Sequence, residues 1–489
     1  MTLAGLLTYF SILLAVLALA RPVRRRSLTL FVPLWPIVAA ILLSLIFIIC
    51  RDAPLGVSPP FRWQLPMVQF ALTLGAFLLP VGTALWGWTT WYRAKLTARN
   101  IGRVENVFRA ALREREFDEV ERIVRKNQEG LEQLPTSAAS VLFDPAVVAA
   151  LVESHSLVHL ELLANMSFLK SLENRLGAVD VVVRELLRSS VSPIRSAVVS
   201  RYGGLEHLRY TDLDQELMNS TFQNPEWYLE AIAHYPLVIS AVEVLRRGEY
   251  DAAYNDSGRD YEATQGISTR SRCPVYLAAK AEVLAIEAAL EKQAQGDFYV
   301  SDLFDIFLAV QERSTFKQAV WQSSRNNPEF PTPYAYLLHE IAADLRYLSS
   351  KAVQKATSTS APRRIEAPGE IAHALAQSWS FCVWSIADSE KQVGPSFRNH
   401  IIQQYLTFVL ELGWEPSELY FGHIGNGVDG LQIWRDLFLK ELQERFAGGS
   451  PRTINALQNA MKSLDHGKRY VFEGYEWLEK SLLGSPESK

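Results

Sequence analysis

The chain contains little cysteine, and its cysteines are not arranged for chemistry. Its 489 residues include only three, Cys50, Cys273 and Cys382, which are far apart in the sequence. A sparse, odd set of this kind predicts neither a disulfide framework nor closely spaced zinc ligands. The chain also lacks a P-loop for phosphate and the Gly-x-Ser-x-Gly motif of a nucleophile elbow. The sequence therefore favours a protein that is not an enzyme and that carries no cofactor.

Acidic residues are almost absent from the first 95 positions. Eight basic residues and one acid, Asp52, lie there, which gives a net charge of about +7. The whole chain has a net charge of −4, so residues 96–489 carry about −11. Nucleic-acid binding needs a surplus of Lys and Arg on one face, and an acidic body argues against it. The charge split indicates a basic membrane part followed by an acidic soluble part, with no nucleic acid as partner.

Three long runs of the sequence contain no charged residue and no histidine. They cover residues 3–20, 28–50 and 66–89, and each is long enough to cross the hydrocarbon core of a bilayer as a helix. The first run does not match a cleaved signal peptide, because its basic residues follow the apolar stretch instead of preceding it. We therefore predict a membrane domain at residues 1–92 with three transmembrane helices.

Basic residues beside the spans predict their direction, because Lys and Arg near span ends are retained in the cytoplasm. Two groups determine the topology: Arg21, Arg24, Arg25 and Arg26 after the first span, and Arg93 and Lys95 after the third. The loop between the second and third spans is poorer in basic residues. The N-terminus is thus expected outside and the body after residue 92 in the cytoplasm, and we favour a bacterial inner membrane. The segment RPVRRRS, residues 21–27, is then a cytoplasmic turn that contacts anionic lipid headgroups.

Aromatic residues and small residues complete the prediction for the membrane domain. Interfacial aromatics are expected at Trp63, Trp86, Trp88, Trp91 and Tyr92. Ala71 and Gly75 have the small-xxx-small spacing that permits close helix packing. No ionisable side chain lies within a span, although transport pathways usually need one. The spans are therefore interpreted as an anchor, with an oligomeric pore lined by apolar side chains as the alternative.

After residue 92 the pattern changes to amphipathic helices, with no useful stretch of alternating residues that would indicate strands. We predict an all-α fold: a juxtamembrane helical hairpin at 93–134, a helical cytoplasmic domain at 135–353, a linker at 354–369 and a C-terminal helical domain at 370–484. Helix starts of the Asp144-Pro145 type recur. Two of them, near Asp144 and Asn224, suggest a degenerate repeat of about 80 residues, which leaves a solenoid-like arrangement open.

Three motifs resemble chemical sites but lack the context that such sites need. The Gly425-x-Gly427-x-x-Gly430 string opens a helix, but the second strand of a dinucleotide-binding unit is missing. His155 and His159 have the spacing of two metal ligands on one helix, without a third ligand to nominate. Asp212 and Asp214 are expected to cap a helix start. No metal site and no cofactor site is therefore predicted.

These observations favour a membrane-tethered scaffold, sensor or regulator whose helical cytoplasmic region binds another protein. The expected partners are the lipid bilayer with its anionic headgroups, an unidentified cytoplasmic protein and further copies of this chain. One alternative is an oligomeric effector that perturbs the membrane in bacterial stress or phage defence. A second alternative is an enzyme with an unrecognised helical active site, for which the catalytic residues are unknown.

Overall fold

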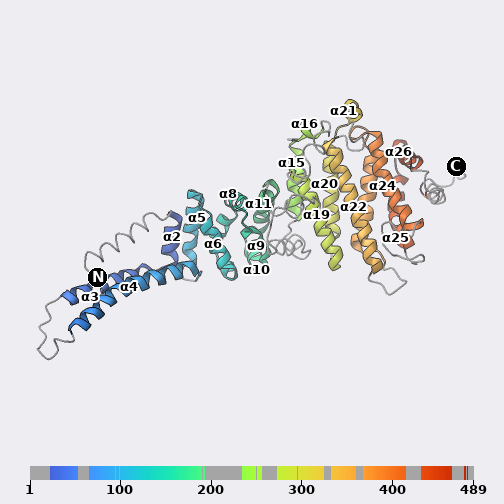
Figure 1. The fold of residues 1–489 in the computed structure, drawn as a ribbon. Coiled ribbons are helices and arrows are strands. Elements are labelled where there is room, and N and C mark those ends of the chain that lie inside the picture. Colours follow the sequence, from blue (N-terminus) through green and yellow to red (C-terminus); the bar gives the residue numbers. More distant parts are fainter. Residues whose placement is uncertain are drawn as a thin grey trace. The chain divides into compact units, whose positions relative to one another are not determined.

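The computed structural model is all-helical, as the sequence predicts (Figure 1). It describes residues 22–52, 65–189, 234–255, 273–323, 332–358, 367–414 and 431–464, except residues 94, 98, 99, 249 and 295, together with a few isolated positions beyond these ranges. No strand occurs within these described stretches. The chain forms two compact units, Met1–Val181 and Val182–Lys489. The first predicted span, residues 3–20, lies outside the described residues.

The second predicted span differs from the structure at its beginning. One helix was expected over residues 28–50, but the chain forms α2 (Pro22–Phe31) and then α3 (Leu34–Asp52). The break includes Pro33, whose ring clashes with a preceding helical turn and which has no N–H to continue it. Pro22 suits the first turn of α2, where no hydrogen bond from its nitrogen is needed. The RPVRRRS segment is therefore helical from its proline onward, and not a turn.

Helix α3 packs along α4 (Leu65–Arg93) in the first unit (Figure 1). Gly75 of α4 faces the ring of Phe47 on α3, and a Cβ at this position would lie 2.8 Å from the nearest ring carbon. Ile48 and Ala76 are buried between the two helices. The absence of a side chain at Gly75 therefore permits the close approach that the small-residue spacing predicts at this position.

One described helix, Pro66–Arg93, is long and apolar enough to cross a membrane. The structure has two such candidates if α7 (Thr136–Leu142) and α8 (Pro145–Glu153) form a single span with a bend of 46° between them. Helix α3 contributes a shorter apolar stretch, Trp35–Arg51. The arrangement with three spans remains a prediction.

Two short helices follow the end of α4 in the sequence. Helix α5 (Val104–Glu114) and helix α6 (Asp118–Lys126) are joined at Arg115, which adopts a left-handed conformation with φ of 54°. Their apolar residues recur every three or four positions and are buried, as in an amphipathic helix that covers a core. Val107 and Ile123 are examples, with 2% and 0% of their surface exposed. Both helices pack against α2.

The rest of the first unit is a series of short helices. After α7 and α8 come α9 (Val158–Ala164), α10 (Met166–Ser171) and α11 (Arg175–Arg188), whose second half belongs to the other unit. The start of α8 follows the predicted pattern, because the Asp144 carboxylate accepts a hydrogen bond from the Ala146 N–H at 2.9 Å. The proline after Asp144 occupies the first helical position. Local capping therefore sets this helix start.

The second unit is a bundle of longer helices (Figure 1). Its described elements are α15 (His234–Arg246), α16 (Asp251–Tyr254), α19 (Pro274–Lys292), α20 (Asp297–Arg313), α21 (Gln318–Ser323), α22 (Pro333–Ser358), α23 (Glu370–Asp388), α24 (Pro395–Trp414), α25 (Leu431–Ala447) and α26 (Pro451–Lys462). Trp379 of α23 is fully buried, with the rings of Tyr405 and Phe408 at 4.7 and 5.2 Å from its own. These aromatic contacts form part of the core of the bundle.

The helices on either side of the predicted linker, residues 354–369, belong to the same unit. Helix α22 continues through Ser358, and so extends five residues into the predicted linker. Helices α22 and α23 pack against each other. The second copy of the proposed repeat begins at Asn224, outside the described residues. A solenoid-like arrangement therefore remains a prediction.

Candidate functional site: the junction at the end of helix α4

Helix α2 exposes Arg24 and Arg26 and buries another face. Val23, Ser27 and Phe31, spaced by four residues, have 0%, 0% and 7% of their surface exposed. Arg24 and Arg26 are exposed. Arg21 and the side chain of Arg25 lie outside the described parts of the chain. This helix is therefore amphipathic, with part of its basic face available to a negatively charged surface.

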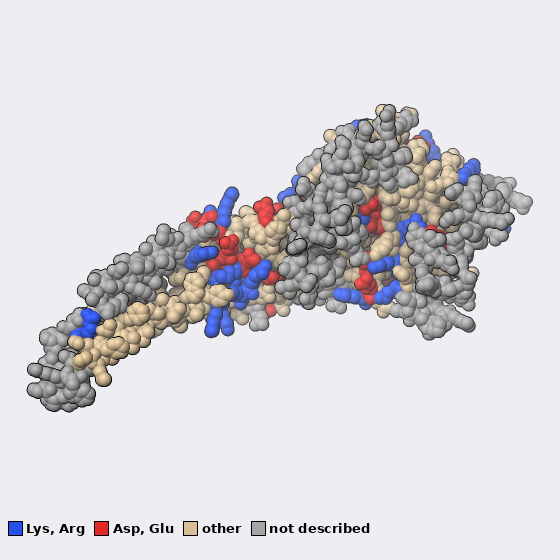
Figure 2. Space-filling view, in the orientation of Figure 1, with Lys and Arg blue, Asp and Glu red and all other residues tan. Residues whose placement is uncertain are grey.

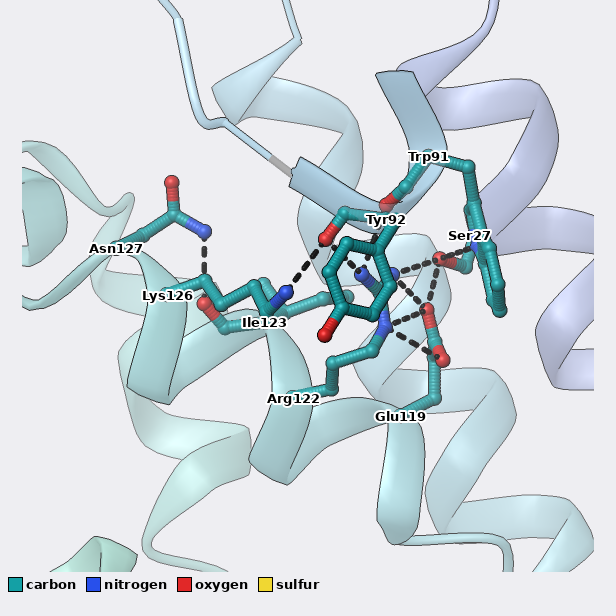
Figure 3. A network of polar contacts seen from close by, with 8 residues as sticks. All are labelled: Ser27, Trp91, Tyr92, Glu119, Arg122, Ile123, Lys126 and Asn127. Carbon is teal, nitrogen blue, oxygen red and sulfur yellow. Dashed lines mark hydrogen bonds and ion pairs between the residues drawn. The ribbon is translucent and has the colours of Figure 1, made fainter. Parts of the chain in front are cut away.

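The C-terminal end of α4 is held by two cations of α6. The last carbonyl groups of a helix have no partner within the helix and carry a partial negative charge. Arg122 donates a hydrogen bond from Nη1 to the Trp91 carbonyl at 2.8 Å, and Lys126 donates from Nζ to the Tyr92 carbonyl at 2.7 Å (Figure 3). The two side chains therefore satisfy carbonyl groups that α4 leaves unpaired, and they fix α6 to its end.

A buried carboxylate and a buried hydroxyl complete this network. Glu119, which is 4% exposed, accepts a hydrogen bond from Arg122 Nε at 3.0 Å and another from the Ser27 hydroxyl. Ser27 Oγ in turn accepts hydrogen bonds from Arg122 Nη2 and Trp91 Nε1, both at 3.2 Å (Figure 3). A single serine of α2 thus connects α4 with α6. Because every one of these groups is paired, burying them carries little penalty.

Aromatic faces strengthen the same contacts. The Arg122 guanidinium lies 4.5 Å from the ring centroid of Trp91, and Lys126 Nζ lies 3.5 Å from that of Tyr92. Asn127 adds a link beyond the helix, because its Oδ1 accepts a hydrogen bond from the Leu96 N–H at 2.6 Å. We call this set the junction cluster: Ser27, Trp91, Tyr92, Glu119, Arg122, Lys126 and Asn127. It joins α2, α4 and α6 by charge-assisted hydrogen bonds and cation–π contacts.

The predicted membrane-surface residues fall into two groups in the structure. Trp86, Trp88 and Tyr92 have 41%, 62% and 58% of their surface exposed, as an interfacial aromatic belt requires. Trp91 is instead half-buried in the junction cluster. Arg93 and Lys95 are exposed. Trp63 lies outside the described residues.

The two histidines with metal-ligand spacing do not share a helix. His155 lies in the turn between α8 and α9 with φ of 61° and is exposed, whereas His159 belongs to α9 and is 2% exposed. The His159 Nε2–H donates a hydrogen bond to the Leu142 carbonyl at 2.8 Å. Burial lowers the pKa of His159 to about 4. His159 is therefore a neutral structural side chain.

A pocket of about 390 Å³ lies beside this histidine in the first unit. Phe143 and Phe168 line it and stack on each other, with ring centroids 6.3 Å apart. Its polar lining is limited to a few side chains, among them Glu173 and Asn174 at the exposed surface. No titratable group is buried within this lining. The pocket therefore has the lining of an apolar groove and not of a catalytic centre.

The second unit buries several charged groups on α19 and α22. Lys280 Nζ lies 2.5 Å from Asp344 Oδ2 and 3.1 Å from Glu340 Oε2. Burial disfavours the charged lysine, but these carboxylates outweigh burial and raise the pKa of Lys280. Burial raises the pKa of Asp344 to about 6. Glu282 is fully buried, and neither of its oxygens has a hydrogen-bond partner, so burial raises its pKa well above its ordinary value.

The remaining sequence motifs lie outside the described residues. Asp212, Asp214 and the glycine string at 425–430 are not among the described residues. Sequence reasoning also missed the junction cluster, because Glu119 and Arg122 look like an ordinary exposed pair on a charged helix. The burial of Glu119 depends on Ser27, which lies 92 residues earlier in the chain. The buried face of α2, with apolar or small residues at every fourth position, was the available signal.

No three His, Cys, Asp or Glu side chains converge as a metal site within the described stretches. The arrangement at the end of α4 thus supports mechanical connection more directly than it supports chemistry. No family model, curated protein or solved structure matches the chain.

Proposed function

We propose that this chain is an integral membrane protein whose helical cytoplasmic region binds another protein as a scaffold, sensor or regulator. The observation that carries the membrane part is the distribution of exposed apolar side chains. Of 19 large hydrophobic residues that are exposed in the described structure, 16 lie on α3 and α4. Water would be a poor solvent for such a surface, and a lipid bilayer is the natural one.

The exposed apolar surface continues along both helices. On α3 it includes Trp35, Leu42 and Ile49, and on α4 it includes Phe70 and Phe77. The face of these helices seen in Figure 2 is free of charge along most of its length, whereas acidic and basic residues gather near the end of α4. Helix α4 is about 43 Å long at 1.5 Å per residue, and so exceeds a hydrocarbon core of about 30 Å. Its last turns and the junction cluster therefore belong at the membrane surface.

The packing of α2 supports the direction proposed for the spans. Because α2 lies against α5 and α6, its arginines are on the same side as the helices that follow the membrane domain. Only two residues separate α3 from the end of α2, and α4 ends at the junction cluster. Both ends of the α3–α4 pair thus lie on one side, which the positive-inside rule makes the cytoplasm. The connecting residues 53–64 are then outside.

The basic residues near the junction give this side a lipid partner. Arg24, Arg26, Arg93 and Lys95 are exposed. Each contributes roughly 1 kcal/mol of binding near an anionic lipid surface. We therefore propose anionic headgroups as partners of this face, in addition to a cytoplasmic protein and to further copies of the chain.

Topology is tested by reporter fusions after residues 26, 58 and 100. The expected readings are cytoplasm, exterior and cytoplasm, and a cytoplasmic reading at 58 would contradict the proposal. Extraction of the membrane fraction with alkaline carbonate provides a second test. The full-length chain is expected to remain in the pellet, and its release into the supernatant would rule out integral insertion.

Partner binding is tested by photo-crosslinking of the full-length chain in its own membrane. A photoreactive residue replaces Ile433, which is 53% exposed on α25, or as a matched control Phe70, which is 70% exposed on α4. Position 433 is expected to capture a cytoplasmic protein, and position 70 lipid or membrane protein. Equal capture of the same protein at both positions would contradict a cytoplasmic partner. Leakage of dye from cells after induction would favour the membrane-perturbing alternative instead.

A further inference from the structure

Two histidines and a glutamine meet on adjacent helices of the second unit. His339 lies on α22, and His400 and Gln404 lie one turn apart on α24, which packs beside α22 (Figure 1). All three side chains are half-buried, so the cluster is accessible from the surface. The imidazole rings face each other with centroids 5.2 Å apart. Metal sites in helical bundles are commonly built this way, from side chains that project from facing helices.

Three polar atoms of this cluster form a nearly regular triangle. His339 Nδ1 lies 3.3 Å from His400 Nε2, and Gln404 Nε2 lies 3.3 Å and 2.9 Å from these two atoms. Zinc bonds to nitrogen are about 2.0–2.1 Å long, and a tetrahedral site therefore holds its ligand atoms about 3.3 Å apart. The triangle matches the separation of three ligand atoms around one such ion.

Hydrogen bonds satisfy this triangle poorly in the amide orientation of the structure. The two N–H bonds of an amide diverge by about 120°, so Gln404 cannot direct both at imidazole nitrogens that lie this close together. Its Oε1 is buried and has no hydrogen-bond partner. Turning the amide about its last bond exchanges its nitrogen for Oε1, which then faces the two imidazoles. In that orientation Oε1 can accept an N–H from each imidazole, or all three side chains can donate a lone pair to a cation within the triangle.

The charges around the cluster suit a cation. Glu340 is adjacent to His339 in the chain, and both it and Asp344 contact Lys280. Two carboxylates therefore accompany one ammonium group in this region, which leaves an excess of negative charge. Imidazole and oxygen ligands together favour zinc and neighbouring late transition metals over magnesium or calcium, which prefer oxygen alone.

We propose that His339, His400 and Gln404 form a binding site for one late first-row divalent cation of the zinc class. The set contains only two strong ligands, and it therefore differs from a closed structural zinc site with four. The site is independent of the proposed membrane function, because it lies in the second unit and uses none of the residues of the junction cluster. A bound ion would connect α22 to α24.

The test uses the full-length chain in detergent at pH 7.5, purified on a tag without histidine. Titration with Co²⁺ is expected to give the visible absorption of four-coordinate cobalt at one equivalent, and Zn²⁺ is expected to remove that absorption. His339→Ala and His400→Ala should each abolish it. His373→Ala, which removes an exposed histidine of α23, should leave it unchanged. No saturable absorption in the wild-type chain, or equal loss in His373→Ala, would overturn the proposal.

Substitutions of Gln404 distinguish metal binding from a structural role, because only metal binding predicts a change in Zn²⁺ affinity. Gln404→Glu supplies a carboxylate, a stronger ligand than an amide, and is expected to tighten Zn²⁺ binding in competition with a fluorescent chelator. Gln404→Ala is expected to weaken it. Zn²⁺ should also raise the unfolding temperature of the wild-type chain and of Gln404→Glu, but not that of His400→Ala. Unchanged Zn²⁺ affinity in both glutamine variants would remove Gln404 from the site.

Discussion

The buried histidine of α9 should make the first unit sensitive to acid. His159 is 2% exposed, and burial lowers its pKa to about 4, from an ordinary value of 6.5. Between these two pH values the unfolded chain binds a proton that the folded chain does not bind. The free energy of unfolding therefore falls as the pH drops from 6.5 toward 4, and the stabilisation is fully present only above pH 6.5. At about 1.36 kcal/mol per pKa unit, the total loss is about 3 kcal/mol, of which about 2 kcal/mol has occurred by pH 5.

The substitution His159→Gln isolates this effect, because a glutamine can still donate to the Leu142 carbonyl but does not titrate. Hydrogen exchange of peptides from residues 143–164 measures the local opening free energy in the full-length chain, after correction for the intrinsic effect of pH on exchange. On going from pH 7 to pH 5, the opening free energy of the wild type should fall by about 2 kcal/mol more than that of the variant. His155→Gln, which changes an exposed histidine nearby, should behave like the wild type. Parallel pH profiles for wild type and His159→Gln would refute the reasoning.

Three further substitutions test other parts of the structure. Arg122→Gln leaves the buried Glu119 without its cation, so we expect the local free energy of unfolding to fall by about 3 kcal/mol. Hydrogen exchange in residues 118–127 should become faster, and unchanged exchange would contradict the network. Glu282→Met removes two buried oxygens that have no partner, and should raise the unfolding temperature of the second unit by an amount corresponding to about 1–3 kcal/mol; a fall would show that Glu282 is paired. Trp379→Ala leaves a cavity at a fully buried site and should lower the free energy of unfolding, measured in urea, by about 3–5 kcal/mol. A decrease below about 1 kcal/mol would contradict the place of Trp379 in the core.

Much of the helical fold could be predicted from the sequence because its signals are local. The amphipathic pattern after residue 92 predicts helices, and α23, Glu370–Asp388, is one of them. The start of α8 followed from Asp144 and the proline after it. Helix α20 shows the same signal, because Tyr299, Leu303, Ile306 and Val310 recur at helical spacing and are buried. The signal is weaker there, since aromatic and β-branched residues have lower helix propensity.

The junction cluster and the histidine pair could not be predicted, for a different physical reason. Whether Glu119 is buried depends on where α2 packs, and residues 21–27, most of which belong to α2, were interpreted as a turn between two spans. His339 and His400 are 61 residues apart in the chain and meet only because α22 and α24 pack together. Sequence spacing records neighbours on one helix. It does not record which helices become neighbours.

In the proposed membrane orientation, the length of α4 makes the thickness of the bilayer a mechanical variable for this protein. A helix of 29 residues exceeds a hydrocarbon core of about 30 Å, and a longer helix in a thinner bilayer responds by tilting. In most anchors such tilting would end in a loose linker. Here the last carbonyls of α4 are held by Arg122 and Lys126, so a tilt of the helix must either move α6 with it or break those hydrogen bonds. Under the proposed topology, a change in lipid composition would therefore reach α6 as a displacement.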